Sequence, residues 1–158
     1  MKIISSDHFF SKMSWLMEVA KGQDWVFCHT SALECLDLFI GYLNEDQVDV
    51  YAKEKGEFEN VNYYIVDTFD HLEIETFRNI RYTSAIQTFN DMLADYDNID
   101  SQSFIEALSE YYYNHNESFS GLLIEEKNLG VFDSVKDWAI EYHFKETAQQ
   151  VEKPSPDK

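Results

Sequence analysis

Length, composition and charge narrow the class of protein before any motif is considered. The chain has 158 residues, 44% of them hydrophobic and 16% aromatic, which is too apolar for a disordered protein. A chain of this length buries roughly 70% of its unfolded surface, so it can form a domain without a metal or a disulfide. Its 30 acidic residues against 12 Lys and Arg give a net charge of −18. Nucleic acid and anionic membranes would repel such a protein unless its scattered cations gathered on one face, so a charged partner should be basic.

The ends and the cysteines indicate an ordinary cytoplasmic protein. The sequence contains no run of about 18 apolar residues, and the stretch 1–7 turns polar too soon for a secretory signal. Two cysteines, Cys28 and Cys35, lie seven positions apart, which fits neither a metal nor a redox motif. We therefore expect buried free thiols, a cytoplasmic location and no contact with a membrane.

The first elements are predicted from spacing and capping. Apolar residues at helical spacing predict a helix over 7–21, which Gly22 ends. Residues 25–28 are too few for a helix and rich in β-formers, so they predict a buried strand. The segment Ser31–Glu34 fits a capping box and predicts a short helix to about Phe39.

The middle of the chain is predicted to form a sheet. Apolar and polar residues alternate over 48–52, as in a half-buried strand. The polar stretch 53–57 contains a glycine and predicts a turn that folds this strand against 61–66 as a β-hairpin. A further extended stretch over 72–82, with a break inside it, completes an expected antiparallel sheet of three or four strands.

The remainder is predicted to be helical. The expected helices are one over 84–95 that Ser84 caps, one capped by Asp100 or Ser101, a short segment over 118–125, and a last helix from Ser134. The fold class is therefore α+β, with an N-terminal helix, a small antiparallel sheet and a C-terminal helical layer. We expect residues 1–147 to form one domain and 148–158, which lose their apolar residues and carry two prolines, to form a flexible tail.

Metal binding is not predicted. The histidines do not pair at i+4 or within an HExxH or CxxC frame, so we expect surface or hydrogen-bonded side chains at His8, His29, His71, His115 and His143. The acidic stretch 91–100 lacks the glycine of a calcium loop and is expected to be a solvated face, with Asp100 capping a helix. No cofactor is expected.

Enzymatic motifs are also absent from the sequence. It contains no G-x-S-x-G frame, no phosphate-binding loop and no G-x-G-x-x-G motif. We expect no catalytic residues, although a nucleotide-handling enzyme with an unrecognised site stays open as an alternative. Among the three tyrosines at 111–113, two are expected in the core and Tyr113 on the surface, where an acid-rimmed tyrosine suits a protein partner.

Three segments together resemble the AbiEi family, the antitoxins of abortive-infection systems. Residues 25–36 resemble the strand-turn-helix "S-A-L-x-x-L" segment, and 48–51 follow as a matching strand. Residues 80–93 resemble the "T-s-x-x-R-T-x-x-D-x-L" stretch. The helix that contains Glu106–Leu108 follows at the right distance, so the resemblance covers roughly residues 24–125.

Two departures from the family pattern bear on function. Gln87 occupies the position where the family commonly has Arg, which puts any anionic contact of that residue in doubt. Only about 24 residues precede the matching strand, whereas the family's winged helix-turn-helix, which binds promoter DNA, needs three helices and a wing. The resemblance implies a non-catalytic antitoxin that neutralises a nucleotidyltransferase-like toxin, typically without binding it stably, and here without direct contact to nucleic acid.

A second interpretation of the charge is an acidic decoy that mimics nucleic acid and occupies a basic protein. For either function, Tyr113 is one candidate residue, and the others lie around the start of the predicted helix 84–95. These others are Arg81, Thr83, Ser84, Thr88 and Asp91. Each also has a purely structural interpretation, in which Ser84 caps the helix, Thr88 bonds back to its own helix and Asp91 is solvated.

Overall fold

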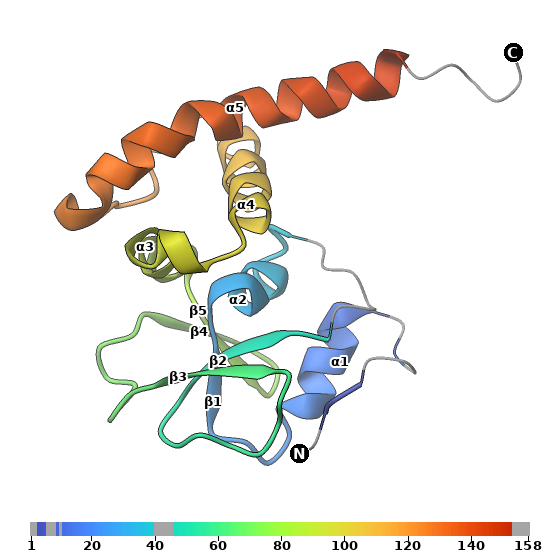
Figure 1. The fold of residues 1–158 in the computed structure, drawn as a ribbon, viewed down its shortest axis with the longest axis vertical. Helices are drawn as coiled ribbons and strands as arrows, with labels where there is room; N and C mark the ends of the chain where they lie inside the picture. The colour runs from blue at the N-terminus through green and yellow to red at the C-terminus, as the bar shows by residue number, and fades with distance from the viewer. Residues whose placement is uncertain (1–2, 6–8, 10, 40–45, 153–158) are drawn as a thin grey trace, which may run out of the picture.

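A computed structural model defines residues 3–5, 9, 11–39 and 46–152, with side chains described as far as Tyr142 (Figure 1). The described residues form an α+β fold, as predicted, around a five-stranded sheet in the order β3-β2-β1-β5-β4. The strands are β1 (Trp25–Phe27), β2 (Val48–Ala52), β3 (Val61–Ile65), β4 (Ile74–Phe77) and β5 (Ile80–Thr83). The helices are α1 (Lys12–Val19), α2 (His29–Cys35), α3 (Ala85–Ala94), α4 (Ser101–Asn114) and α5 (Leu129–Glu152), with 3-10 turns η1 (Tyr96–Asn98) and η2 (Glu126–Asn128).

One face of the sheet packs on α1. Alternate residues of β1 and β2 point to this face because side chains alternate along a strand. They surround the fully buried Trp15 and Leu16 of α1 in a cluster that includes Trp25, Phe27, Val48, Val50 and Ala52. The predicted alternation of apolar and polar residues over 48–52 is therefore confirmed, and the two valines of this strand face α1.

The opposite face of the sheet carries the other helices. Helix α2 packs on β2 and β5, α3 lies beside α2, and α4 and α5 lie farther out from the sheet (Figure 1). Their apolar faces form a second core around Phe89, Phe104, Leu108 and Val135. The sheet is thus covered by helices on both sides, and the larger helical layer is the C-terminal one, as expected.

The predicted hairpin between 48–52 and 61–66 is wrong, because β2 and β3 pair in parallel, with Val48 opposite Val61. The connection over 53–60 runs back along the sheet, and the Val48 amide donates to the carbonyl of Asn60 at 3.1 Å. This connection is longer than the two to five residues usual in hairpins. Within it, Gly56 lies against the Tyr63 side chain, where a Cβ atom would collide with the tyrosine hydroxyl. The sheet is therefore mixed, with β1 and β5 also parallel and the predicted antiparallel pairing seen between β4 and β5.

Several helix boundaries differ from those predicted. Helix α2 starts at His29 after Cys28 and ends at Cys35, and Ser31 lies inside it, so the capping box and the end at Phe39 are both wrong. The segment 118–125 is not helical, and α5 begins at Leu129 rather than Ser134. The caps expected at Ser84 and Asp100 are confirmed, since both side chains accept from backbone amides of the first turn.

The two ends of the chain are described only in part. Helix α1 begins at Lys12 behind the cap Ser11, and 6–8 and 10, where the helix was expected to start, lie outside the described residues. The helical backbone of α5 continues to Glu152, and 153–158 of the expected tail are likewise outside them. Within the described part of the chain, no helix has both the length and the apolar character needed to cross a bilayer.

Candidate functional site

The predicted site at the junction of β5 and α3 is a buried hydroxyl cluster. Thr83 and Thr88 are fully buried, and their hydroxyls lie 2.6 Å apart. The Thr88 hydroxyl also reaches the Ser84 carbonyl at 2.6 Å, and the Ser84 side chain accepts from the Gln87 amide at 3.1 Å. The structural interpretation of Ser84 and Thr88 is confirmed. These hydroxyls fix the direction in which α3 leaves the sheet, and none of the three residues is exposed to a ligand.

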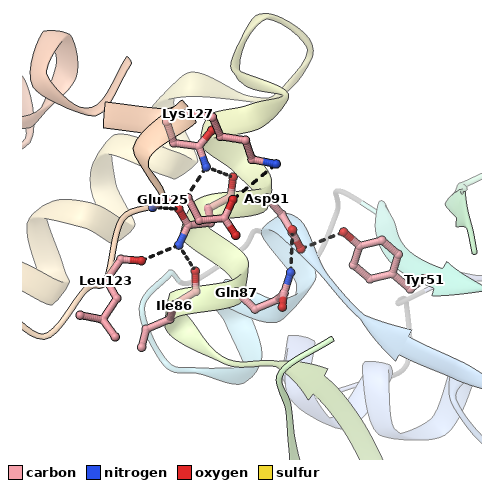
Figure 2. A network of polar contacts seen from close by, with 9 residues as sticks. Tyr51, Ile86, Gln87, Asp91, Leu123, Glu125 and Lys127 are labelled. Carbon is pink, nitrogen blue, oxygen red and sulfur yellow. Dashed lines mark hydrogen bonds and ion pairs between the residues drawn. The ribbon is translucent and has the colours of Figure 1, made fainter. Parts of the chain in front are cut away.

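Asp91, one turn farther along α3, links this helix to the sheet. It is half-buried rather than solvated. Its carboxylate accepts hydrogen bonds from the Tyr51 hydroxyl at 2.8 Å and from the side-chain amide of Gln87 (Nε2) at 2.9 Å (Figure 2). Burial raises the pKa of the Asp91 carboxyl, and the two donors oppose that rise. Gln87, at the position of the family's Arg, therefore contacts a carboxylate of its own helix.

Asn90, next to Asp91, holds the chain that leads into α5. Its amide nitrogen donates to the carbonyls of Ile86 and Leu123, each at 2.9 Å, and its amide oxygen accepts from the backbone of Glu125 at 2.8 Å (Figure 2). The Asn128 side chain adds a bond to the same oxygen at 3.0 Å. The segment expected to be helical at 118–125 is thus held by side-chain hydrogen bonds instead of by helical ones.

The two other candidate residues lie away from this junction. The Arg81 guanidinium bonds to Asp24 at 2.8 Å, which lowers the pKa of that carboxyl, and it also lies over the ring of Phe69. Tyr113 is half-buried, and its hydroxyl donates to the Ile140 carbonyl at 2.9 Å, joining α4 to α5. Tyr113 is therefore partly exposed, and its hydroxyl serves the contact between α4 and α5.

A cavity that the sequence did not indicate opens beside the edge strand β3, on the face that carries α2. Its volume is about 200 Å³, and its walls come from β2, β3, one face of α2, the turn before α4 and the first residue of α1, Lys12. Strand pairing sets Asp49 opposite Asn62 and Tyr51 opposite Tyr64. Polar side chains therefore gather on the part of the sheet that α2 leaves uncovered.

His29 is the most unusual residue in this cavity. It is 4% exposed, and its ring stacks on Tyr64 with centroids 4.1 Å apart and planes inclined by 6°. Burial lowers the pKa of its imidazole to about 4, so the ring is neutral at pH 7. Its Nδ1 has no hydrogen-bond partner among the described residues, which corrects the expectation of a surface or hydrogen-bonded histidine.

In addition to its buried side chain, His29 has a strained backbone. Its φ of 49° lies in the left-handed region, which residues other than glycine enter at a cost. The strain arises where the chain turns from β1 directly into α2. Left-handed residues that the surrounding structure holds in place are frequent at binding sites, so the position is a candidate for function.

Asp49 supplies a half-buried acid to the cavity. Its carboxyl oxygens accept from the Thr30 amide at 3.2 Å and from the Asn62 amide group at 2.8 Å. The residue is half-buried, and desolvation raises the pKa of its carboxyl, while the two donors and the charge of Lys12 oppose the rise. A half-buried carboxylate in a cavity that a buried histidine, unpartnered at Nδ1 among the described residues, also lines is an arrangement suited to donor-rich groups.

The surface carries its positive charges in local pairs. Five described cations contact a nearby acid, in the pairs Lys21–Glu18, Lys53–Asp24, Arg81–Asp24, Lys127–Glu125 and Lys136–Asp133. Lys12 is buried at the cavity and lies over the Trp15 ring. Two of these cations, Lys53 and Arg81, share the single carboxylate of Asp24.

The described residues that could ligate a metal ion lie apart from one another. The described histidines, cysteines and acids do not gather in groups of three or more that could hold a metal ion. Cys28 is buried and Cys35 half-buried, both as free thiols, and burial raises the pKa of both thiols, so neither is a ready nucleophile.

Comparison with known proteins does not place the chain. No protein-family profile matches it, and no curated protein matches it. Its function has therefore to be argued from its own residues.

Proposed function

We propose that the protein is a non-catalytic, antitoxin-like domain that neutralises a toxin without contacting DNA. The support is the way in which the three segments that resemble AbiEi antitoxins come together. Residues 25–36 form β1 and α2, 48–51 lie in β2, and 80–93 form β5 and α3. Strand β1 pairs with both β2 and β5, and α2 packs on α3, so segments far apart in sequence build one unit.

The hydrogen bond between Tyr51 and Asp91 carries the proposal. These residues belong to two different segments of the resemblance, 40 positions apart, and each is placed by the other. In this unit Thr83, Thr88 and Asp91 connect α3 to the sheet, and their side-chain oxygen atoms form hydrogen bonds within the protein. Such roles suit a scaffold that presents a binding surface and not a catalytic centre.

The test is rescue from toxicity. The full chain is co-expressed with each nucleotidyltransferase-like gene found beside its own gene, and colony formation is counted with and without it. A toxin with its catalytic residues removed controls for the burden of expression. We expect one toxin to be neutralised by the chain. If no neighbouring gene is toxic, or if toxicity persists in every pair, the antitoxin proposal is wrong.

A second function, an acidic decoy for a basic protein, is favoured by the charge distribution. A net charge of −18 with cations already paired to acids leaves a negative field around the described surface. Decoy binding depends on that field, so capture of a basic protein should weaken steeply with ionic strength. Rescue without a stable complex supports the antitoxin, whereas a salt-sensitive complex without rescue supports the decoy.

A further inference from the structure

The cavity beside β3 has a chemical character of its own, separate from the scaffold around Asp91. Its lining includes the carboxyl groups of Glu34, Asp49 and Asp100 against the single ammonium group of Lys12. His29 adds a neutral ring, and the remaining polar lining is made of amide and hydroxyl side chains. The acceptors outnumber the positive charges, so a group with several N–H donors and a positive charge complements this lining.

The orphaned nitrogen of His29 points to a missing partner. The ring is 4% exposed and lines the cavity, and its Nδ1 makes no hydrogen bond to any described residue. Buried polar groups nearly always have a partner, and leaving one without it is unfavourable. Nδ1 itself is enclosed by protein, so a ligand in the cavity reaches it only after a small shift of the ring's surroundings, and the neutral ring can then accept a hydrogen bond.

Asp49 has acceptor capacity left over. Each of its two carboxyl oxygens receives one donor, from Thr30 and from Asn62, while an ionised carboxylate has about four acceptor directions. Burial raises the pKa of this carboxyl, so its negative charge is poorly compensated by the protein alone. A cation in the cavity would provide the compensation that the described contacts do not complete.

We infer that the cavity binds the guanidinium group of an arginine side chain from a protein partner. Guanidinium is planar, permanently charged and carries five N–H donors, so one group can donate to Asp49 and to further acceptors of the lining, and its plane suits a wall that includes the ring of Tyr64, one face of which His29 covers. A lysine ammonium is a compact point charge and lacks the plane that stacks on a ring. The identity of the partner rests on the proposed function, whereas the guanidinium chemistry rests on the cavity.

The size of the cavity and the net charge of the chain both favour an arginine that belongs to a protein. A cavity of about 200 Å³ is smaller than the 300–1,000 Å³ usual for small-molecule sites, so it takes a head group and leaves the rest of the ligand outside. A net charge of −18 attracts basic proteins and increases their rate of encounter. One inserted arginine would then fix the position of a partner held by the wider field.

The test uses the full chain and small probes. Acetyl-arginine amide, which mimics an arginine within a protein, is titrated while backbone amide signals are followed by NMR. Acetyl-citrulline amide has nearly the same shape without the charge and is the matched control. We expect saturable shifts at residues 29, 30, 49 and 62 with the arginine probe only. Equal shifts with both probes, or shifts confined to other residues, would overturn the inference.

Two substitutions with the same change of charge localise the site. Asp49→Asn removes the carboxylate of the cavity, and we expect the dissociation constant of the arginine probe to rise about tenfold. Asp137→Asn removes an exposed carboxylate on α5, which contributes nothing to the cavity, and should leave the constant unchanged. If Asp49→Asn fails to fold, the comparison of arginine with citrulline on the unchanged protein still decides the matter.

Further probes separate the source of the guanidinium and the sign of the ligand. Tighter binding of free arginine than of acetyl-arginine amide would contradict a protein side chain and indicate a small molecule. Inorganic phosphate that shifts residues 29 and 49 where the arginine probe does not would show an anion site built on Lys12. Rescue of growth without arginine binding defeats only the cavity inference, and arginine binding without rescue defeats only the antitoxin proposal.

Discussion

Replacing His29 by Asn tests the electrostatics of the cavity through the pH dependence of stability. The substitution removes the titrating ring, and Asn is among the residues that best tolerate a φ of 49°. In the folded protein, burial lowers the pKa of His29 to about 4, from an ordinary value of 6.5. One pKa unit corresponds to about 1.4 kcal/mol, so the difference corresponds to about 3 kcal/mol.

The sign follows from which state binds more protons. Between pH 4 and pH 6.5 the unfolded chain holds a proton on His29 that the folded chain does not, so stability rises with pH in this window. This contribution is complete above about pH 6.5 and is lost as the pH falls toward 4. The raised pKa values of Asp49 and Asp91 act in the opposite direction, and they are shared by the wild type and the variant.

The assay is urea unfolding of both proteins at a series of pH values from 7 down to 4. The difference in free energy of unfolding, wild type minus His29→Asn, should decrease by about 3 kcal/mol on going from pH 7 to pH 4. Gln23→Asn, a non-titrating change at an exposed position, controls for the substitution itself and should follow the wild-type profile. Parallel profiles for the wild type and His29→Asn would refute the reasoning, whatever their absolute stabilities.

Three further substitutions test the scaffold, all by urea unfolding. Thr88→Val keeps the shape but removes the hydroxyl that bonds to the Ser84 carbonyl, and it should cost about 1–3 kcal/mol; a change within error would contradict a structural role. Tyr51→Phe should cost about 1–2 kcal/mol at pH 7 and less in acid, where Asp91 is protonated, and an equal cost at both pH values would be a contrary result. Asn90→Ala leaves several buried groups without their partner and should cost at least about 3 kcal/mol, with faster amide exchange over 123–128; retained protection there would show that other contacts hold the segment.

The starts of α3 and α4 were predictable because their signals are local. Ser84 and Asp100 cap their helices as expected, since a cap needs only the side chain and the next few backbone amides. The antiparallel pairing of β4 with β5 was predictable for the same reason, because two residues separate the strands. The alternation over 48–52 also identified a strand with one buried face.

The pairing of β2 with β3 was not predictable from local pattern. A strand's own residues show which face is buried and leave open whether its neighbour runs parallel or antiparallel. Here the connection folds back through contacts far apart in the chain, such as those between the Asn60 side chain and the backbone of Ile4. The start of α2 was misjudged similarly, because the Ser31 hydroxyl accepts from the Asp49 amide on the neighbouring strand instead of capping its own helix.

The candidate site shows the same division between local and distant signals. Roles set within a few residues, such as those of Ser84 and Thr88, could be predicted from the helix start. The cavity could not, because Asp49, Asn62 and His29 meet only through strand pairing and the packing of α2. One signal was present in the sequence, an acid at a position that alternates with buried valines, although such an acid ordinarily faces water.

The claim that this protein acts on other proteins and not on nucleic acid is tested most directly by titration with a labelled DNA duplex at low salt. With a net charge of −18 and five of its described cations in contact with acids, the protein should leave the anisotropy of the duplex unchanged even at high protein concentration. The same titration with an RNA duplex should give the same result. Tight binding that weakens steeply as salt is added would contradict the account, because it would require a concentrated positive surface, which a net charge of −18 opposes.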